Sequence, residues 1–247
     1  MSFGFWNVRG LMNPIKQAEV RQFVHLNNIC CVGLLETKVP ATTFPNLSSG
    51  LLLGWMWVFN YEHSSRERIW VGWNPLLVCL NTRTSTDQII HGDVHFLNSG
   101  YTLSLSVVYG EHTFVARRPL WSELISLSSS LKECPWMVAG DFNAIRDPSD
   151  RMGSPDIWIP TFDNFKECLD QAELFDLRYV GFQFTWFTSS GTQRKQRKID
   201  WVLVNNCWCN TFSFSEASFM APGLSDHYSN GCKNSCTYFS SDSFQIF

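Results

Sequence analysis

The chain has 247 residues, of which 45% are hydrophobic, 15% aromatic and 17% charged, and it carries a formal net charge of −3. This length and apolar content predict one large domain with a sizeable core. The sequence has no signal-peptide pattern and no uncharged apolar run of about 18 residues, so we expect a soluble, intracellular protein that crosses no membrane. The acidic balance gives no basic field over the whole molecule, so charge alone does not indicate a nucleic-acid partner.

The first part of the chain has the pattern of strand, helix and strand. Residues 3–10 suit a short strand, and residues 13–28 suit a helix that opens with a capping asparagine and a proline. The nearly continuous apolar run over 29–38 predicts a strand that is buried on both faces until Glu36 ends it.

Strand patterns dominate the middle of the chain, and helical patterns return at 117–131 and 161–173. An NSG sequence at 98–100 indicates a hairpin. The remaining predicted strands cover residues 55–61, 68–74, 93–97, 102–110, 137–145, 183–189 and 198–205. Because hairpins are mixed with helical crossovers, the pattern predicts an α/β fold of two mixed sheets packed together, with helices outside.

Nine cysteines are spread along the chain, unlike the dense disulfide framework of a small secreted protein, so we expect reduced thiols. The cysteines within 207–209 and 232–236 leave open a zinc-binding module, and a non-catalytic remnant is a related alternative. Cys207 lies in a strand-like context, and the spacing fits no familiar zinc pattern, which argues against a zinc module.

Polar side chains recur where the apolar strands stop. These residues are Asn7, Glu36, Tyr109, Asp141, Asn143, Asp200, Asp226 and His227. Taken alone, each has an ordinary structural explanation, such as a turn cap for Asn7 and Asp226 or a loop position for His227. Glu36 can form a surface ion pair with Lys38. Sites in sheet proteins are assembled from strand ends and the loops after them, so the joint pattern favours a functional site.

A basic run directly precedes Asp200 and is the local exception to the acidic balance. It contains Arg194, Lys195, Arg197 and Lys198. A solvated loop explains such a run when it is taken alone. If Asp200 belongs to a site, the run instead lies along the path of an anionic substrate.

Seven short motifs occur in a fixed order along the chain. They are WNVRG (6–10), GLLETK (33–38), VVYG (107–110), GDFNAI (140–145), FTW (184–186), KIDWVLVN (198–205) and SDH (225–227). In this order and at these separations they resemble the endonuclease/exonuclease/phosphatase family. The closest likeness is to the endonuclease domain of LINE-type (non-LTR) retrotransposons, particularly those of plants.

The resemblance implies a four-layer α-β-β-α sandwich of the deoxyribonuclease type, with the site at one end of the two sheets. It also implies hydrolysis of a phosphodiester in duplex DNA with Mg²⁺ or Mn²⁺, by a monomer that works in the nucleus. A reverse transcriptase segment is expected in a full-length element and is not present in this sequence. A phosphatase or an exonuclease of the same family, acting on another phosphoester, would share most of the site and is the main alternative.

The resemblance also implies roles for the metal ligands and for the residues that act on water. Glu36 would bind the metal, and Asp226 would take part in the metal shell. Asp141 and Asn143 would orient the attacking water and hold the phosphate, and Asn7 would support Asp141. Magnesium prefers carboxylate oxygens and keeps waters and substrate phosphate, which agrees with these residue types.

The remaining implied roles concern the phosphate and the leaving group. Tyr109 would contact the phosphate, and Thr185 is a weaker match for a second contact. Asp200 would orient His227, since a carboxylate partner fixes the tautomer of an imidazole and favours its charged form. The basic residues Arg194, Lys195, Arg197 and Lys198 would line the substrate path.

The sequence after His227 departs from the family. The family continues with a short apolar strand, whereas residues 228–247 are polar and rich in Ser, Asn and Cys. We therefore expect a domain over 1–227 and a divergent tail over 228–247 that replaces the last strand, as in a truncated copy. A neighbouring strand would lose its partner, so low solubility and impaired activity follow.

Overall fold

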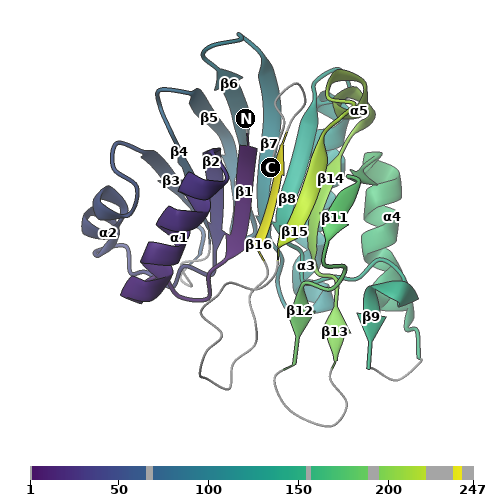
Figure 1. Cartoon of the computed structure of the whole chain (residues 1–247). Coiled ribbons are helices and arrows are strands. Elements are labelled where there is room, and N and C mark those ends of the chain that lie inside the picture. The colour runs from purple at the N-terminus through teal and green to yellow at the C-terminus, as the bar shows by residue number, and fades with distance from the viewer. Residues whose placement is uncertain (1, 65–68, 154–156, 189–194, 221–235, 241–247) are drawn as a thin grey trace.

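The computed structural model describes residues 2–64, 69–153, 157–188 and 195–220, together with the backbone of residues 236–240. Two mixed β-sheets pack face to face, and helices cover the outer face of each sheet (Figure 1). The layers therefore follow the order α, β, β, α, and the four-layer sandwich predicted from the sequence is confirmed. None of the helices in these residues is long and apolar enough to cross a membrane.

The first sheet contains strands from both ends of the chain. Its strands are β1 (Ser2–Asn7), β2 (Ile29–Leu35), β3 (Met56–Phe59), β4 (Ile69–Trp73), β11 (Tyr179–Gly181), β15 (Glu216–Met220) and β16 (Cys236–Ser240). They lie in the order β11-β15-β16-β1-β2-β4-β3. β1 and β2 are parallel, as the predicted strand-helix-strand unit requires, and the neighbours on either side of this pair are antiparallel to it.

The second sheet lies in the order β10-β14-β8-β7-β6-β5. Its strands are β5 (Val78–Ser85), β6 (Ile89–Phe96), β7 (Thr102–Tyr109), β8 (Trp136–Asp141), β10 (Phe175–Asp176) and β14 (Asp200–Val204). β6 and β7 form the predicted hairpin, and β7 and β8 are parallel. A small third sheet of β9 (Arg151–Met152), β12 (Trp186–Phe187) and β13 (Gln196–Arg197) lies at the end of the sandwich where β1 ends (Figure 1).

Four of the helices, α1 to α4, form two pairs that cover opposite outer faces. The elements are α1 (Pro14–Leu26), α2 (Phe44–Leu51), α3 (Phe114–Ser130), α4 (Asp163–Ala172) and α5 (Asn206–Thr211), with short 3-10 turns η1 (Pro148–Asp150) and η2 (Pro160–Phe162). α1 and α2 pack on the first sheet, and α3 and α4 pack on the second. The Asn13 side chain accepts a hydrogen bond from the Ile15 N–H at 2.9 Å, so the predicted cap of α1 is confirmed.

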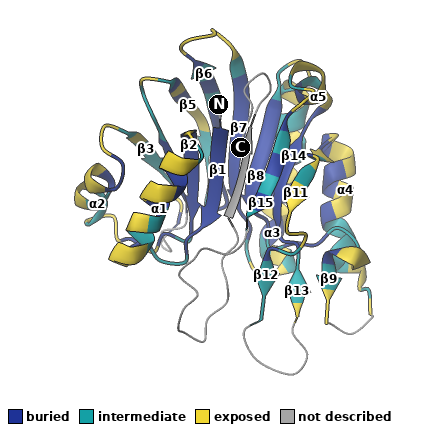
Figure 2. Ribbon diagram, in the orientation of Figure 1, coloured by how far each residue is buried: buried dark blue, intermediate teal, exposed yellow. Residues whose placement is uncertain are grey.

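Buried apolar residues form a core between the sheets and one under each helical layer, and Figure 2 shows the sheets as the most buried part of the molecule. Strand alternation assigns side chains to these cores. On β8, Met137 and Ala139 face the other sheet, whereas Val138 faces the helices. Asp141 continues the series that faces the other sheet, so alternation places its carboxylate between the two sheets.

The same alternation ends in a polar residue on other strands. Phe3 and Phe5 lead to Asn7 on β1, and Leu105 and Val107 lead to Tyr109 on β7. These strands end at the same edge of the sandwich, because Asn7 hydrogen-bonds to Asp141 across the sheets and Tyr109 is the register partner of Asp141. The fold thus concentrates at one end the polar groups that would otherwise interrupt the core.

The C-terminal segment differs from the expectation. The backbone of β16 is antiparallel to both β1 and β15, pairing Phe5 with Thr237 and Phe219 with Thr237. The expectation that no strand follows His227 is therefore wrong. Backbone hydrogen bonds need no apolar alternation, and the Thr-Tyr-Phe sequence at 237–239 has high strand propensity.

Other elements were missed or read differently in the sequence. The patterns predicted neither β5 nor β15, and they predicted neither α2 nor α5. Cys207 and Cys209 lie on α5 and not in a strand, and within the described residues they belong to no cluster of metal ligands. Short amphipathic elements such as α5 carry too few residues for a periodic signal.

The backbone at Gly140 gives a first test of the fold. Gly140 has φ of +139°, and an added Cβ would lie 2.1 Å from the Val108 carbonyl oxygen. Gly140→Ala should lower the free energy of unfolding by about 2–4 kcal/mol, measured by urea denaturation. The control is Gly50→Ala on α2, where an added Cβ meets nothing within 4 Å; it should raise stability by about 0.5–1 kcal/mol. Equal effects of the two variants would contradict the close packing of β7 on β8.

Candidate active site

The side chain of Asn7 lies at the centre of the site. It is 5% exposed at the end of β1, and its Nδ2 donates to Glu36 Oε1 and to Asp141 Oδ2, at 2.9 Å each. Glu36 follows β2 in the sheet that contains Asn7, whereas Asp141 ends β8 in the opposite sheet. One amide group therefore holds a carboxylate from each sheet, and three of the predicted site residues come together.

Glu36 is held in its charged form. It has φ of +49°, so the chain turns sharply directly after the buried strand β2. Burial acts to raise the pKa of its carboxyl, but hydrogen bonds from Asn7, Tyr109 and Lys38 outweigh it and leave this pKa below its usual value. Lys38 Nζ also lies 3.2 Å from Glu36 Oε2, so the surface ion pair and the site share the same carboxylate.

The pKa of Asp141 is shifted in the opposite direction to that of Glu36. Burial, together with the nearby charge of Glu36, raises the pKa of its carboxyl to about 6, against hydrogen bonds from Asn143 and Asn7. The Asn143 N–H donates to Asp141 Oδ1 at 2.9 Å, and Asn143 Nδ2 donates to the Gly110 carbonyl at 2.8 Å. Asn143 also has φ of +49°. A pKa near 6 suits a group that takes up a proton near neutral pH.

Asp200 and Tyr109 flank Asp141 in the second sheet. Asp200 is the register partner of Asp141 on β14, and Tyr109 is its partner on β7. The Thr185 Oγ1 accepts hydrogen bonds from the backbone N–H groups of Ile199 and Asp200, at 3.1 Å each, so Thr185 fixes the start of β14. The contacts of Thr185 and Tyr109 with a phosphate stay predictions.

The predicted site residues Asp226 and His227 lie outside the described residues. The predicted pair of Asp200 with His227 and the metal ligation by Asp226 therefore stay predictions. The last described residue before them is Met220, at the end of β15. In the first sheet, β16 lies between β15 and β1.

The groups around Asn7 fit a divalent cation. Glu36 offers a hard oxygen ligand of the kind that Mg²⁺ and Mn²⁺ prefer, and the carboxylate of Asp141 lies beside it on the same amide. The Asn7 Oδ1 is buried and, within the described residues, has no hydrogen-bond partner, so a further oxygen ligand is available at the same place. No group of three or more Asp, Glu, His or Cys comes together in the described part of the chain. Magnesium sites commonly use one or two carboxylates and keep waters and substrate oxygens, so this small donor set suits them.

The described residues of the basic run differ in how far they are exposed to solvent. Arg194 lies outside the described residues, and Lys195 is exposed. Arg197 is half-buried, and its guanidinium carbon lies 5.5 Å from the centre of the Trp186 ring. Lys195 and Arg197 are therefore placed near the start of β14 and stay candidates for substrate contact.

The position of Lys198 contradicts the role predicted for it. Its side chain is 2% exposed, and its Nζ lies 2.5 Å from Asp176 Oδ2. The same Nζ lies 4.0 Å from the centre of the Tyr179 ring and 4.2 Å from that of Trp201. The expectation that Lys198 lines the substrate path is wrong, because its charge is neutralised inside the core by a carboxylate and two aromatic faces.

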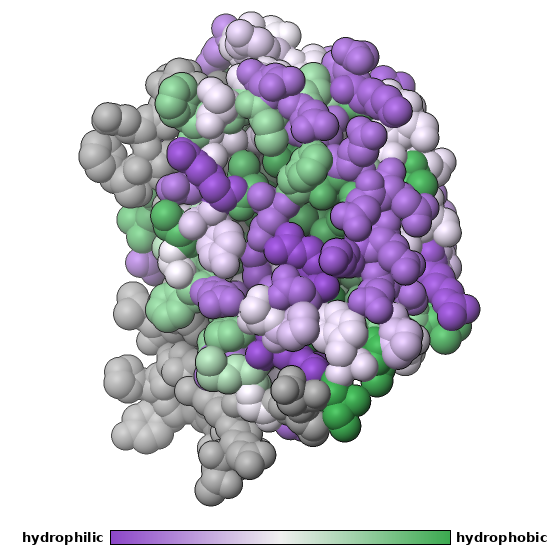
Figure 3. Space-filling view, turned by 90° about the vertical axis from the view of Figure 1, so that its right-hand side faces the viewer, coloured by the Kyte–Doolittle hydropathy of each residue, from purple (hydrophilic) through white to green (hydrophobic). Residues whose placement is uncertain are grey.

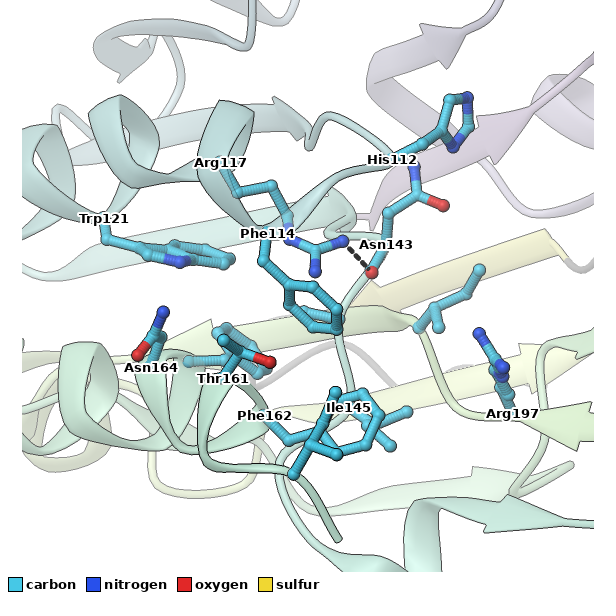
Figure 4. Close-up of a pocket in the computed structure, with 14 residues that line it drawn as sticks. His112, Phe114, Arg117, Trp121, Asn143, Ile145, Thr161, Phe162, Asn164 and Arg197 are labelled. Atoms are coloured by element: carbon cyan, nitrogen blue, oxygen red, sulfur yellow. Dashed lines mark hydrogen bonds between the residues drawn. The ribbon is translucent and has the colours of Figure 1, made fainter. Parts of the chain in front are cut away.

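A cavity of about 270 Å³ lies directly beside Asn143, between the start of α3, the loop after β8, and η2 (Figure 4). Figure 3 shows one side of the molecule, where hydrophilic side chains predominate and hydrophobic ones are exposed between them. The sequence reasoning did not identify this cavity, because its lining comes from segments that are far apart in the chain.

Arg117 is a site residue that the sequence reasoning missed. It is 4% exposed, and its Nη1 donates to the carbonyls of Glu111, at 3.1 Å, and of Asn143. It thereby holds the loop that carries Asn143. A signal was present, since Arg117 lies on the apolar stripe of α3 with Leu120 and Leu124, where an arginine must find internal partners.

Carboxylates and amides gathered at one end of an α-β-β-α sandwich define a class of metal-dependent hydrolases. The model of the Endonuclease/Exonuclease/phosphatase family matches residues 4–227, and the protein belongs to this family. The family predicted from the seven motifs is thereby confirmed. Enzymes of this family are typically phosphodiester hydrolases and generally use divalent metals. No curated protein gives a significant sequence match.

Solved structures with the same fold have several activities. The endonuclease domain of TRAS1, a telomere-specific non-LTR retrotransposon, has a TM-score of 0.67 and 13% identity, with 99% of each chain covered. The AP endonuclease LMAP from Leishmania major has a TM-score of 0.69 and 12% identity, over 97% of this chain and 87% of that chain. A mannosyl-6-phosphatase from Bacteroides thetaiotaomicron has a TM-score of 0.62 and 13% identity, over 97% and 98%. These likenesses show the shared fold.

The raised pKa of Asp141 predicts a gain of stability when its charge is removed. A native pKa of about 6, above the ordinary 3.8, means that ionisation favours the unfolded state at pH 7. This penalty disappears as the pH falls from 6 to about 4, where the native carboxyl is protonated. Without metal, Asp141→Asn should therefore raise the free energy of unfolding at pH 7 by about 1–3 kcal/mol, with little gain at pH 4.

Urea denaturation in EDTA measures this effect. The matched control is Asp170→Asn on the exposed side of α4, which should change stability little at either pH. Equal stability of the wild type and Asp141→Asn at pH 7 would contradict the raised pKa.

Proposed function

We propose that this protein is a divalent-metal-dependent phosphodiester hydrolase that nicks one strand of duplex DNA, as the endonuclease domain of a LINE-type retrotransposon does. The observation that carries the proposal is the Asn7 amide, which holds Glu36 and Asp141 at 2.9 Å each. The fold shared with the TRAS1 endonuclease domain supports a DNA substrate. The residues of the motifs, such as WNVRG and KIDWVLVN, favour a retrotransposon of a plant. A nuclear location follows from such a substrate.

The residues around Asn7 prepare the attacking water. Glu36 would hold the cation together with Asn7 Oδ1, and the cation would offset the charge that develops on the phosphate. Asn143 fixes Asp141 through its backbone N–H, and its own side chain is fixed on Gly110. Asp141, which Asn143 and Asn7 hold in place, accepts a proton from the water.

The other side of the site serves the phosphate and the leaving group. In this mechanism Tyr109, which hydrogen-bonds to Glu36, contacts a phosphate oxygen. In this mechanism His227, oriented by Asp200, gives a proton to the leaving oxygen as the bond from phosphorus to that oxygen breaks. A positioned acid of this kind contributes a rate factor of about 10²–10⁴.

The main alternative is a phosphatase that acts on a small phosphoester. The same fold in a mannosyl-6-phosphatase supports this alternative at the level of the sandwich. We favour an extended polyanion as the substrate, because Arg194, Lys195 and Arg197 lie within six residues of the start of β14 at Asp200. Plasmid DNA and mannose 6-phosphate, offered to the same preparation, separate the two functions.

Supercoiled plasmid should be nicked with Mg²⁺ and should stay intact in EDTA. Glu36→Gln, Asp141→Asn and Asn143→Ala should each lower the nicking rate at least about 100-fold, because each removes a group that acts in the transition state. His227→Ala should have a similar effect. The control is Glu167→Gln, an exposed carboxylate on α4, which should nick at the wild-type rate. Nicking in EDTA, or full activity of Glu36→Gln, would overturn the mechanism.

The basic residues before β14 predict the salt dependence of DNA binding. The double variant Arg194→Gln and Lys195→Gln should bind duplex DNA more weakly, and the slope of log affinity against log salt should fall by about 0.9 for each lost phosphate contact. Lys132→Gln is the control, since Lys132 is exposed before β8 at the opposite end of the sheet. An unchanged slope in the double variant would show that these residues make no phosphate contacts and belong to an ordinary solvated loop.

A further inference from the structure

The ammonium group of Lys198 contacts both sheets just before β14 begins. Its Nζ lies 2.5 Å from Asp176 Oδ2 on β10 and 4.2 Å from the centre of the Trp201 ring on β14, both in the second sheet. The centres of the Tyr179 and Phe219 rings lie 4.0 Å and 5.5 Å from it, on β11 and β15 of the first sheet. One buried charge therefore joins the two sheets at the edge of the sandwich that β10 and β11 form.

The backbone around Lys198 is bonded to the loop after β8, which carries Asn143. The Lys198 N–H donates to the Asp150 carbonyl at 2.8 Å, and the Phe142 N–H donates to the Ile199 carbonyl at 2.9 Å. These bonds join the residues that follow β8 to the segment that leads into β14. The contacts that hold Lys198 therefore also set where β14 begins relative to this loop.

The ion pair of Lys198 with Asp176 is an unfavourable way to fill this part of the core. Burial lowers the pKa of Lys198 and raises the pKa of Asp176, so the surroundings disfavour both charges. Asp176 Oδ1 is also buried and has no hydrogen-bond partner within the described residues. Apolar side chains of similar volume commonly stabilise a core as well as a buried ion pair does, or better. A contribution to stability therefore does not account for this pair.

The pair does distinguish one register of β14 from the neighbouring ones. In the structure Asp200 is the register partner of Asp141 on β8. A shift of β14 by one residue would move Lys198 away from Asp176 and leave two unpaired charges inside the protein, which is strongly unfavourable. Apolar side chains at the two positions would impose no such penalty, so the ion pair adds precision in the placement of β14.

We propose that the ion pair of Lys198 with Asp176 positions the active site by holding Asp200 in place relative to Asp141 and Asn143. Both members are positioning residues that act through the backbone of β14, since the Lys198 side chain is enclosed by the core. The inference rests on the proposed function and extends it to a region behind the site.

The test replaces both charges at once in the full chain. Lys198→Met with Asp176→Leu keeps the net charge and should melt at the wild-type temperature or above it. Its kcat for plasmid nicking should fall about 10- to 100-fold, since a displacement of about 1 Å in a reacting group can cost about 10² in rate. Its affinity for duplex DNA in EDTA should not change. The wild-type kcat in the folded double variant would overturn the inference, and so would a rate that falls only with the folded fraction.

The matched control is an ion pair on the outermost strands of the second sheet, far from β14. Arg83 Nε lies 2.8 Å from Asp93 Oδ2, on β5 and β6. Arg83→Met with Asp93→Leu also keeps the net charge and should nick at the wild-type rate. An equal loss of rate in this control would assign the effect to a general change in the protein and overturn the inference.

Asp176→Asn covers the case in which the double variant does not fold. Its amide carbonyl can still accept a hydrogen bond from Lys198 Nζ, but a neutral acceptor binds the ammonium less strongly than a carboxylate does. It should lower kcat several-fold without weakening the binding of duplex DNA. The wild-type kcat in folded Asp176→Asn would overturn the inference.

Hydrogen exchange separates this inference from the proposed function, because it needs no enzymatic activity. In both variants the amide N–H groups of Phe142, Ile199 and Asp200 should exchange about ten-fold faster than in the wild type, with no change in the hairpin of β6 and β7. Unchanged exchange at these amides would overturn the positioning role even if the wild type nicks DNA. Faster exchange at them, in a protein whose wild type nicks no DNA, would support the positioning role and overturn the proposed function.

Discussion

The amide of Asn7 is the contact on which the arrangement of the site depends. Its Nδ2 has two N–H groups, and each donates to a carboxylate from a different sheet, Glu36 and Asp141. Its Oδ1 stays available as a ligand. An aspartate at this position would add a third negative charge, and an apolar residue would leave two buried carboxylates without a donor. Asparagine alone among side chains of this size offers two donors and one acceptor.

This arrangement lowers the free energy of unfolding, and the residues responsible lie at one end of the sandwich. Glu36 and Asn143 both have positive φ, and Gly140 has a backbone that a side chain would not tolerate. Asp141 is buried near a like charge, which a cation would offset. The apolar cores on both faces of each sheet hold these strained groups in place. Strain at strand ends over a regular core is how an active site is commonly built.

The regular part of the fold could be predicted from the sequence, because long strands and helices repeat their apolar pattern many times. The polar end of each strand was also predictable, since Asp141 breaks the pattern of its own strand. Charge runs and short elements were not predictable, because their environment is set by distant residues. The buried Lys198 has its ion-pair partner in Asp176, which lies 22 positions away. The backbone of β16 pairs with β1, which lies at the other end of the chain. The cavity beside Arg117 was missed for the same reason.

The central claim is that Asn7 and Glu36 form a divalent-cation site beside Asp141, and calorimetric titration with Mn²⁺ tests it most directly. The account predicts that the wild type binds one Mn²⁺ and that Asn7→Leu and Glu36→Gln bind it at least about ten-fold more weakly. Circular dichroism melting would show that each variant is folded. Mn²⁺ binding by folded Asn7→Leu with the affinity of the wild type would contradict the account.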